Sequence, residues 1–245
     1  MATFVIVHGA WSGPHAWRWV RPLLRAAGHE VFTPSLTGLG ERAHLGDRTT
    51  NLDTHIEDVL AVLHYEDLHD VILVGHSYGG MVIRGVADRG TGRLAQLVYL
   101  DADVPEDGQC EFDFVSAEER SAWEAAARRR GDSRIPPPFP DPLPPGLPPE
   151  VAWTIARMVP QPVETMAQPI RLTAPASALP PRTFILCTEG KDGEPTPPHV
   201  DRIRTDPEWR LVLLAATHSA HVTAPEALAA ALLALVPERA AQVVR

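Results

Sequence analysis

Six short stretches of the chain are predicted strands, and most of them are apolar at nearly every position, a pattern typical of strands that are buried on both faces of a sheet. These stretches are residues 3–7, 30–36, 71–75, 94–100, 183–188 and 209–215. Between most of them, apolar residues recur at the three- and four-residue spacing of a helix with one buried face. The alternation predicts an α/β fold with a mostly parallel central sheet and helices on both of its faces.

Two of the predicted helices begin with the spacing of a capping box, in which two side chains bind free backbone N–H groups. Thr54 and Glu57 have this spacing before apolar residues at positions 56, 59, 60 and 63. Thr223 and Glu226 repeat it at the last helix, with Pro225 in the first turn, where a missing N–H does no harm. We expect helices to begin at these two threonines.

The alternation stops between Pro105 and Pro180. We find no convincing strand there, and nine of the fourteen residues from 136 to 149 are proline, which is excluded from the interior of a helix or a central strand. Trp123, Phe139 and Trp153 supply apolar surface, which favours a packed segment over the alternative, a disordered linker. We predict a core of residues 1–104 and 181–245 with a partly helical, proline-rich cap at residues 105–180.

Composition narrows the cellular setting and the kinds of partner. The chain has 245 residues, of which 44% are hydrophobic, enough for one domain with a full core. Its formal net charge of -9 argues against nucleic acid and anionic membranes, since both attract basic patches. Cys110 and Cys187 lack metal-ligand spacing, and the sequence contains no signal-peptide pattern and no apolar run of 18 residues. We expect a cytoplasmic protein without a bound metal or cofactor.

The sequence VILVGHSYGGM contains Gly75-x-Ser77-x-Gly79 directly after a predicted strand and directly before a predicted helix. This is the setting of a nucleophile elbow. A serine on such a sharp turn has strained backbone geometry, and small neighbours relieve the crowding around it. Ser77 is therefore the candidate nucleophile.

A second turn motif, VIVHGAW, follows the first predicted strand. Acyl transfer needs two N–H donors that point at the developing oxyanion, one of them from the residue after the nucleophile and one from an early loop. The N–H groups of Tyr78 and Ala10 have these places. His8 precedes the turn at a strand end, and we expect it to form structural hydrogen bonds.

Two histidines, His218 and His221, lie between the last predicted strand and the last helix. A histidine on a late loop is the expected general base for this order of elements. Either histidine could serve, and we favour His218 because it is nearer the strand end and hence the plane of the nucleophile. Their spacing of three does not form a metal-binding motif.

With VHGAW, GHSYGG and THSAHVTAPEAL in place, the chain resembles the α/β-hydrolase superfamily. It looks closest to the group of plant methyl esterases, hydroxynitrile lyases and bacterial carboxylesterases of the pyrethroid-hydrolase type. The resemblance implies an α/β-hydrolase fold, an oxyanion N–H after Gly9 and a catalytic histidine shortly before a helix-opening proline, which matches His218 and Pro225. The lyases of the group typically have a lysine after that histidine and a threonine in place of Gly9. Here Ser219 follows His218, which favours hydrolysis.

The acid that would orient the histidine is harder to assign. In the methyl esterases, an aspartate directly follows the sequence CTE, and here that position is Gly190. In CTEGKDGEP we expect Glu189 to point to the other face of its strand and Glu194 to face solvent. Asp192, on a loop flanked by glycines, is the acid that we predict first.

The alternative acid is Asp103. The sequence LVYLDADVPEDG places Asp101 and Asp103 at the end of the preceding strand, and some α/β hydrolases carry their acid there. In this group the Asp103 position is usually apolar and near the active site, so a carboxylate at that position needs a reason. A site with no orienting acid also stays open, since it would still allow slow catalysis.

The leading hypothesis is a cofactor-independent serine esterase that cleaves a small or medium apolar ester, lactone or thioester through an acyl-enzyme. A non-hydrolytic C–C lyase or cyclase that uses the same pocket is the second hypothesis, and a ligand receptor without turnover is the third. The expected partner is a small apolar ester-like molecule. The sequence leaves a homodimer open. The identity of the substrate depends on the cap, which lines the expected pocket and has the fold that is hardest to predict.

Overall fold

The centre of the protein is a sheet of six parallel strands. A computed structural model describes residues 1–90, 92–190 and 197–237. In these residues the strand order is β2-β1-β3-β4-β7-β8. The strands are β1 (Thr3–Val7), β2 (Glu30–Phe32), β3 (Val71–His76), β4 (Leu94–Leu100), β7 (Arg182–Cys187) and β8 (Trp209–Leu214). The prediction of a mostly parallel α/β sheet is confirmed.

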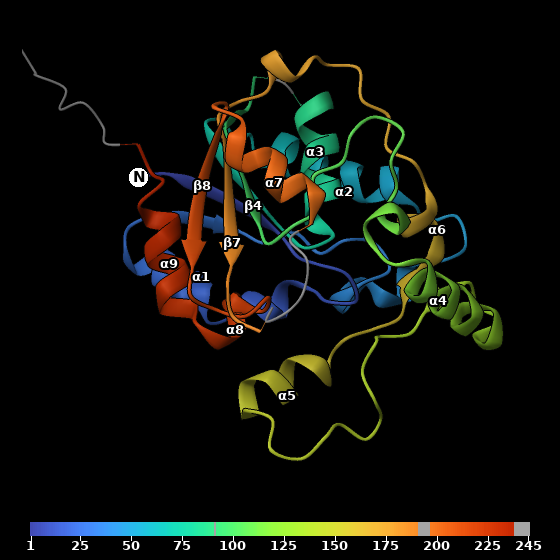
Figure 1. The fold of residues 1–245 in the computed structure, drawn as a ribbon. Coiled ribbons are helices and arrows are strands. Elements are labelled where there is room, and N and C mark those ends of the chain that lie inside the picture. Colours follow the sequence, from blue (N-terminus) through green and yellow to red (C-terminus); the bar gives the residue numbers. More distant parts are fainter. Residues whose placement is uncertain (91, 191–196, 238–245) are drawn as a thin grey trace, which may run out of the picture.

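Helices cover both faces of this sheet (Figure 1). One face carries α1 (Val20–Ala26) and α9 (Pro225–Leu233), and the other carries α2 (Leu52–Tyr65), α3 (Gly79–Arg89) and α7 (Pro198–Thr205). Each face has its own apolar core, because successive side chains of a strand point to opposite sides. In Figure 1 the arrowheads of β7 and β8 point toward α8 (Ala220–Thr223), so this edge holds the carboxyl ends of the strands.

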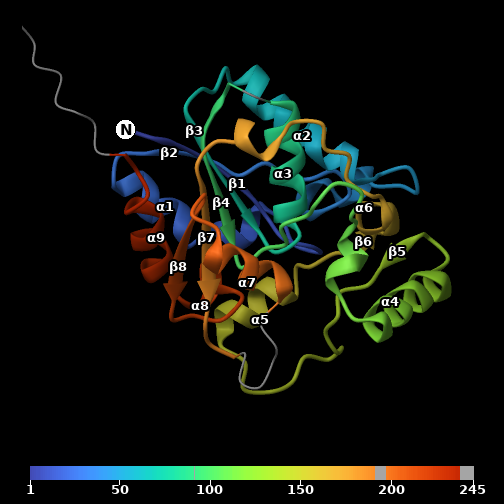
Figure 2. The same ribbon diagram turned by 45° about the horizontal axis from the view of Figure 1, so that its top comes forward.

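The segment between β4 and β7 lies beside and below this edge (Figure 2). Its helices and strands are α4 (Ala117–Arg130), β5 (Arg134–Ile135), α5 (Pro149–Ile155), β6 (Gln161–Pro162) and α6 (Val163–Ala167). The antiparallel pair of two-residue strands was not expected from the sequence. Four 3-10 turns complete the described elements: η1 (Pro14–Trp17), η2 (Gly40–Leu45), η3 (Glu111–Phe114) and η4 (Ala176–Ala178).

The cap is packed against the core. The rings of Trp123 and Trp11 meet edge to face with 5.1 Å between their centroids. Trp153 of α5 contacts Trp19, and Ile135 of β5 is completely buried. In the described part of this segment, these contacts pack it against the core.

The predicted starts of two helices were wrong. The N-cap of α2 lies three residues earlier, at Asn51, whose side chain accepts the N–H of Thr54, and the Thr54 hydroxyl in turn accepts the N–H of Asn51. Asparagine is among the most favourable N-cap residues, so the capping box begins at Asn51. Thr223 belongs to α8, and α9 begins after Ala224 with Pro225 in its first turn. In the described residues we find no helix with the length and apolar character needed to cross a membrane.

Candidate active site

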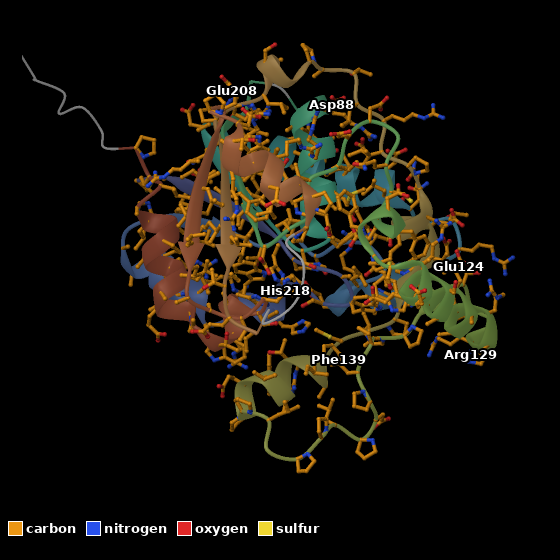
Figure 3. The ribbon with its side chains drawn as sticks, viewed as in Figure 1. Asp88, Glu124, Arg129, Phe139, Glu208 and His218 are labelled. Carbon is orange, nitrogen blue, oxygen red and sulfur yellow. The ribbon has the colours of Figure 1, made fainter. Side chains whose placement is uncertain are left out.

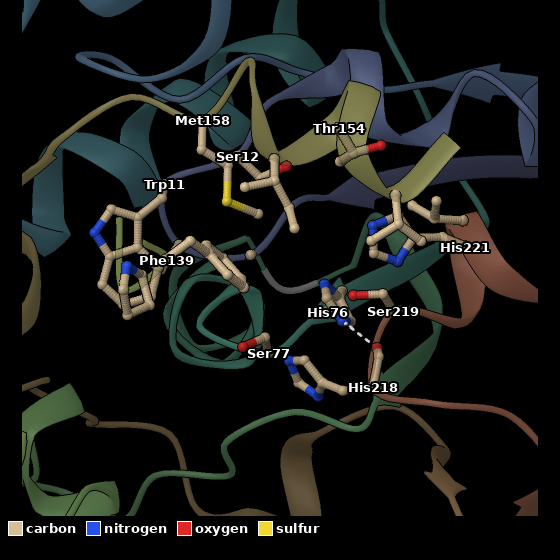
Figure 4. A pocket seen from close by; sticks show the side chains of 16 residues that line it. Trp11, Ser12, His76, Ser77, Phe139, Thr154, Met158, His218, Ser219 and His221 are labelled. Atoms are coloured by element: carbon tan, nitrogen blue, oxygen red, sulfur yellow. Dashed lines mark hydrogen bonds between the residues drawn. The ribbon is translucent and has the colours of Figure 1, made fainter. Parts of the chain in front are cut away.

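Ser77 lies on the tight turn between β3 and α3. Its φ is +54°, a strained value for a residue other than glycine. A Cβ at Gly75 would lie 2.5 Å from the carbonyl oxygen of Gly79, and a Cβ at Gly79 would lie 2.8 Å from that of Val7. A side chain at either position would therefore clash with the backbone. The turn directs Ser77 into a pocket at the carboxyl edge of the sheet (Figure 4).

His218 lies on the loop after β8 and is oriented by a carboxylate. Its Nδ1 donates to Oδ2 of Asp101 at 2.7 Å, and the Asp101 side chain is only 4% exposed. The other oxygen of Asp101 accepts the backbone N–H of Cys187 at 3.2 Å. This arrangement holds the proton on Nδ1 and leaves Nε2 free to act as a base.

Ser77 lies beside the ring of His218 (Figure 4), and both residues line the same pocket. No hydrogen bond joins the two side chains as drawn in that view. Catalytic hydrogen bonds are often long in the free enzyme and tighten when substrate binds. The arrangement has the parts needed for nucleophilic attack on a carbonyl carbon, with proton transfer to the histidine.

In the described residues, the carboxylate bonded to His218 is that of Asp101, which is neither Asp192 nor Asp103. Asp192 lies outside the described residues. Asp103 is close by in sequence, but burial raises the pKa of its carboxyl to about 6, although a hydrogen bond with Glu111 opposes this shift. A carboxyl group that stays protonated to that pH is poorly suited to hold an imidazolium, whereas Asp101 has the required contact. The sequence signal was available: Asp101 is the first residue after β4.

The hydrogen bonds also distinguish the two candidate histidines. His221 is 4% exposed and stacks on Trp17 with 4.9 Å between ring centroids, and its Nδ1 has no hydrogen-bond partner among the described residues. His76, inside the elbow motif, donates Nε2–H to the carbonyl oxygen of His218 at 2.9 Å (Figure 4). This bond ties the histidine loop to the turn that carries Ser77.

The backbone N–H groups of Ala10 and Tyr78 lie on the two turns that flank Ser77. Tyr78 is the N-cap residue of α3, and its buried hydroxyl is 2.8 Å from Nδ1 of His55. The peptide that carries the N–H of Ala10 is held from the other end, because Nδ1–H of His8 donates to the carbonyl oxygen of Gly9 at 2.9 Å. Nε2 of His8 accepts a second hydrogen bond, from a backbone N–H, so the predicted structural role of this histidine is confirmed.

The pocket above Ser77 has a volume of about 270 Å³ and is shared between core and cap. The cap contributes mainly apolar side chains, among them Phe139, Val151, Ile155 and Met158. Phe139 of the cap and His218 of the core lie at the facing edges of the two parts (Figure 3). No pattern in the sequence indicated which cap residues reach the pocket, because the proline-rich loop has no regular period.

Comparisons with known proteins identify the family of this chain. Residues 4–231 fit the model of the Alpha/beta hydrolase family. The chain belongs to the α/β-hydrolase family. This α/β hydrolase is 41% identical over 243 residues to a carbendazim-hydrolysing esterase from Nocardioides sp. (strain SG-4G), an alignment that covers 96% of this chain and all of that protein.

More distant relatives agree with the family. An α-hydroxynitrile lyase from Arabidopsis thaliana is 33% identical over 104 residues, 42% of this chain and 40% of that protein. A solved extracellular α/β-hydrolase from a Paenibacillus species has a TM-score of 0.82 at 24% identity, with 97% of this chain and all of that chain covered. That likeness shows the fold alone. The resemblance stated from the sequence motifs is thereby confirmed.

The α/β hydrolase also buries four histidines that should make it sensitive to acid. Burial, the largest cause in each case, lowers the pKa to about 3 for His8 and His221, to about 4 for His55, and well below 6.5 for His76. Below pH 6.5 these histidines become protonated in the unfolded chain but stay neutral in the folded protein. The free energy of unfolding therefore falls as pH falls.

We expect a loss of up to about 1.4 kcal/mol per pH unit for each of these histidines between pH 6.5 and their folded pKa values. Urea unfolding at pH 7.5, 6.5 and 5.5 measures it. A free energy of unfolding that is constant over this range would show that the four rings become protonated without unfolding.

Proposed function

We propose that this α/β hydrolase is a serine carboxylesterase with the triad Ser77, His218 and Asp101. The observation that carries the proposal is the 2.7 Å hydrogen bond from His218 to Asp101, in a loop that shares its pocket with the Ser77 elbow. The esterase relative, which is aligned over its full length, supports the same class of reaction.

In this mechanism Ser77 Oγ attacks the ester carbonyl carbon while His218 Nε2 takes its proton. The N–H groups of Ala10 and Tyr78 stabilise the tetrahedral oxyanion. Collapse of this intermediate expels the alcohol, which takes the proton from His218, and leaves an acyl group on Ser77. His218 then removes a proton from water, which attacks the acyl-enzyme and releases the carboxylic acid and free Ser77.

The pocket favours a compact, apolar substrate. Its cap wall is formed mainly by apolar side chains, and its volume of about 270 Å³ leaves little room for a long acyl chain. The named substrate of the Nocardioides relative, carbendazim, is a small aromatic methyl carbamate. We therefore propose small aromatic esters and carbamates of short alcohols as the substrate class.

A panel of p-nitrophenyl esters tests the reaction and the size limit together. We expect the acetate and butyrate to be cleaved with higher kcat/KM than the decanoate, because the longer chain exceeds the pocket. Carbendazim and methyl benzoate belong in the same panel. Equal kcat/KM along the series would contradict the proposed size limit.

Isotope incorporation separates hydrolysis from lyase or cyclase chemistry. A hydrolase working in H₂¹⁸O places one ¹⁸O atom in the acid that it releases, whereas a lyase or cyclase product gains no water. Labelling by a fluorophosphonate that substrate suppresses would support the same conclusion, since the probe reacts with an activated serine. Turnover without ¹⁸O in the product would refute the proposed function.

A further inference from the structure

Trp11 directly follows Ala10 in the turn that carries the proposed oxyanion donor, and it is hydrogen-bonded to the cap. Three hydrogen bonds join Trp11 to separate parts of the cap. Its backbone N–H donates to Gln161 Oε1 at 2.9 Å, its indole Nε1–H donates to the carbonyl oxygen of Ile135 at 3.0 Å, and its own carbonyl accepts the N–H of Val159 at 2.9 Å.

The backbone at Trp11 needs this support. Its φ is +58°, in the left-handed region, which a bulky residue adopts only when surrounding contacts enforce it. Ala10 lies between two fixed peptides: His8 holds the carbonyl oxygen of Gly9 on one side, and Gln161 holds the N–H of Trp11 on the other. The direction of the Ala10 N–H therefore depends on both contacts.

The side chain of Gln161 lies in the interior and is held in place by further hydrogen bonds. It is completely buried, and its Nε2 donates to Oγ1 of Thr165 at 2.6 Å, while the same hydroxyl donates to the carbonyl oxygen of Pro162 at 2.7 Å. The amide orientation is fixed as a result, with its oxygen toward Trp11. Because Gln161 occupies the N–H of Trp11, Ala10 is left as the donor that this loop offers to the pocket.

The same network reaches the second proposed donor. Burial raises the pKa of the Tyr78 hydroxyl well above its ordinary value, and the Thr165 side chain opposes this shift. Gln161 thus hydrogen-bonds to Trp11 directly and to Thr165, whose side chain influences the Tyr78 hydroxyl.

We infer that Gln161 is a positioning residue for the oxyanion hole and that the cap completes this hole by pinning the peptide after Ala10. The inference rests on the proposed function, because it assigns a role in that same reaction. Removing one oxyanion donor typically lowers kcat about 10²- to 10³-fold. A residue that only positions the donor should account for a smaller share, roughly 10- to 100-fold.

The test compares Gln161→Met with Gln168→Met. Gln168 is a matched control, since its amide also joins cap to core: it accepts the N–H of Asp53 at 3.0 Å and donates to the Asp53 carboxylate at 2.7 Å. It makes no hydrogen bond to Trp11 in the described structure. Both variants lose one such amide, so a general loosening of the cap should affect them alike.

The readouts are kcat and KM for p-nitrophenyl acetate and the affinity for phenylboronic acid, which forms a tetrahedral adduct with an active serine. For Gln161→Met we expect kcat and boronate affinity to fall together by about 10- to 100-fold, with KM changed less than about 3-fold. Gln168→Met should stay within about 3-fold of the unaltered protein in all three. A cap that is merely loosened would raise KM instead.

The conservative variant Gln161→Glu keeps an oxygen that can accept the N–H of Trp11, and we expect it to recover most of the lost kcat. If Gln161→Met does not fold, Gln161→Asn replaces it, because its side chain is too short to keep this contact. The inference is wrong if these variants match Gln168→Met, or if Gln161→Glu is as impaired as Gln161→Met. Failure of the proposed function has a different signature: the unaltered protein would show no turnover that depends on Ser77.

Discussion

Ser77→Ala is expected to reduce kcat for p-nitrophenyl acetate by a factor on the order of 10⁶, and to abolish labelling by fluorophosphonate. The hydroxyl is the group that would form the acyl-enzyme, and no other side chain can replace that bond. Steady-state kinetics and mass spectrometry of the labelled protein measure the two effects. A burst of p-nitrophenol before the steady state should disappear with them.

Ser219→Ala is the matched control for this change. Ser219 lines the same pocket and directly follows His218, but its side chain makes no capping hydrogen bond at α8. We expect turnover close to that of the unaltered protein. Retained turnover in Ser77→Ala, or an equal loss in both variants, would remove the basis for the proposed nucleophile.

Asp101→Asn should have the second largest effect, a loss of roughly 10³- to 10⁴-fold in kcat. An amide at this position can donate to Nδ1, which favours the wrong tautomer of His218 and no longer stabilises the imidazolium. The side chain keeps its size, and the backbone N–H of Cys187 still finds an oxygen to donate to. Comparison of kcat at pH 8 with the melting temperature separates this electrostatic effect from misfolding.

Asp103→Asn provides the control, because it makes the same change two residues away. We expect kcat at pH 8 to stay close to that of the unaltered protein. Because the folded pKa of Asp103 is raised, its ionisation removes stability as pH rises from about 4 to about 6. Asp103→Asn eliminates that loss and should not lower the free energy of unfolding at pH 8. A large loss of kcat in Asp103→Asn with normal activity in Asp101→Asn would reverse the assignment.

Most of the fold could be predicted from the sequence because its strands are buried on both faces. Most of these strands are apolar nearly throughout, and all six overlap stretches that were predicted from the sequence. The elbow could be placed for a similar reason, since the glycines at 75 and 79 are imposed by close backbone contacts. Helix starts were less certain, because Asn51 and Thr54 can both serve in a capping box and local spacing does not decide between them.

The carboxylate that contacts His218 and the cap residues that reach the pocket could not be predicted, since both depend on contacts between distant parts of the chain. Asp101 is 117 residues from His218, and only the order of the strands brings them together. The family pattern drew attention to the loop after β7, where Gly190 stands in place of the expected aspartate and Asp192 lies outside the described residues. Gln161 gave no signal at all, because its role depends on a contact with Trp11 across 150 residues.

The adjacency of β4 and β7 has an evolutionary consequence. Leu100 pairs with Ile185, so the two strands end side by side, and Asp101, Gly190 and His218 line one common cavity. A carboxylate on either strand end can therefore approach the same imidazole. A lineage can exchange one acid position for the other through two substitutions, with the histidine, the nucleophile and the backbone left in place. Sequence alignments that track a single acid column would then report a lost triad in enzymes that remain fully active.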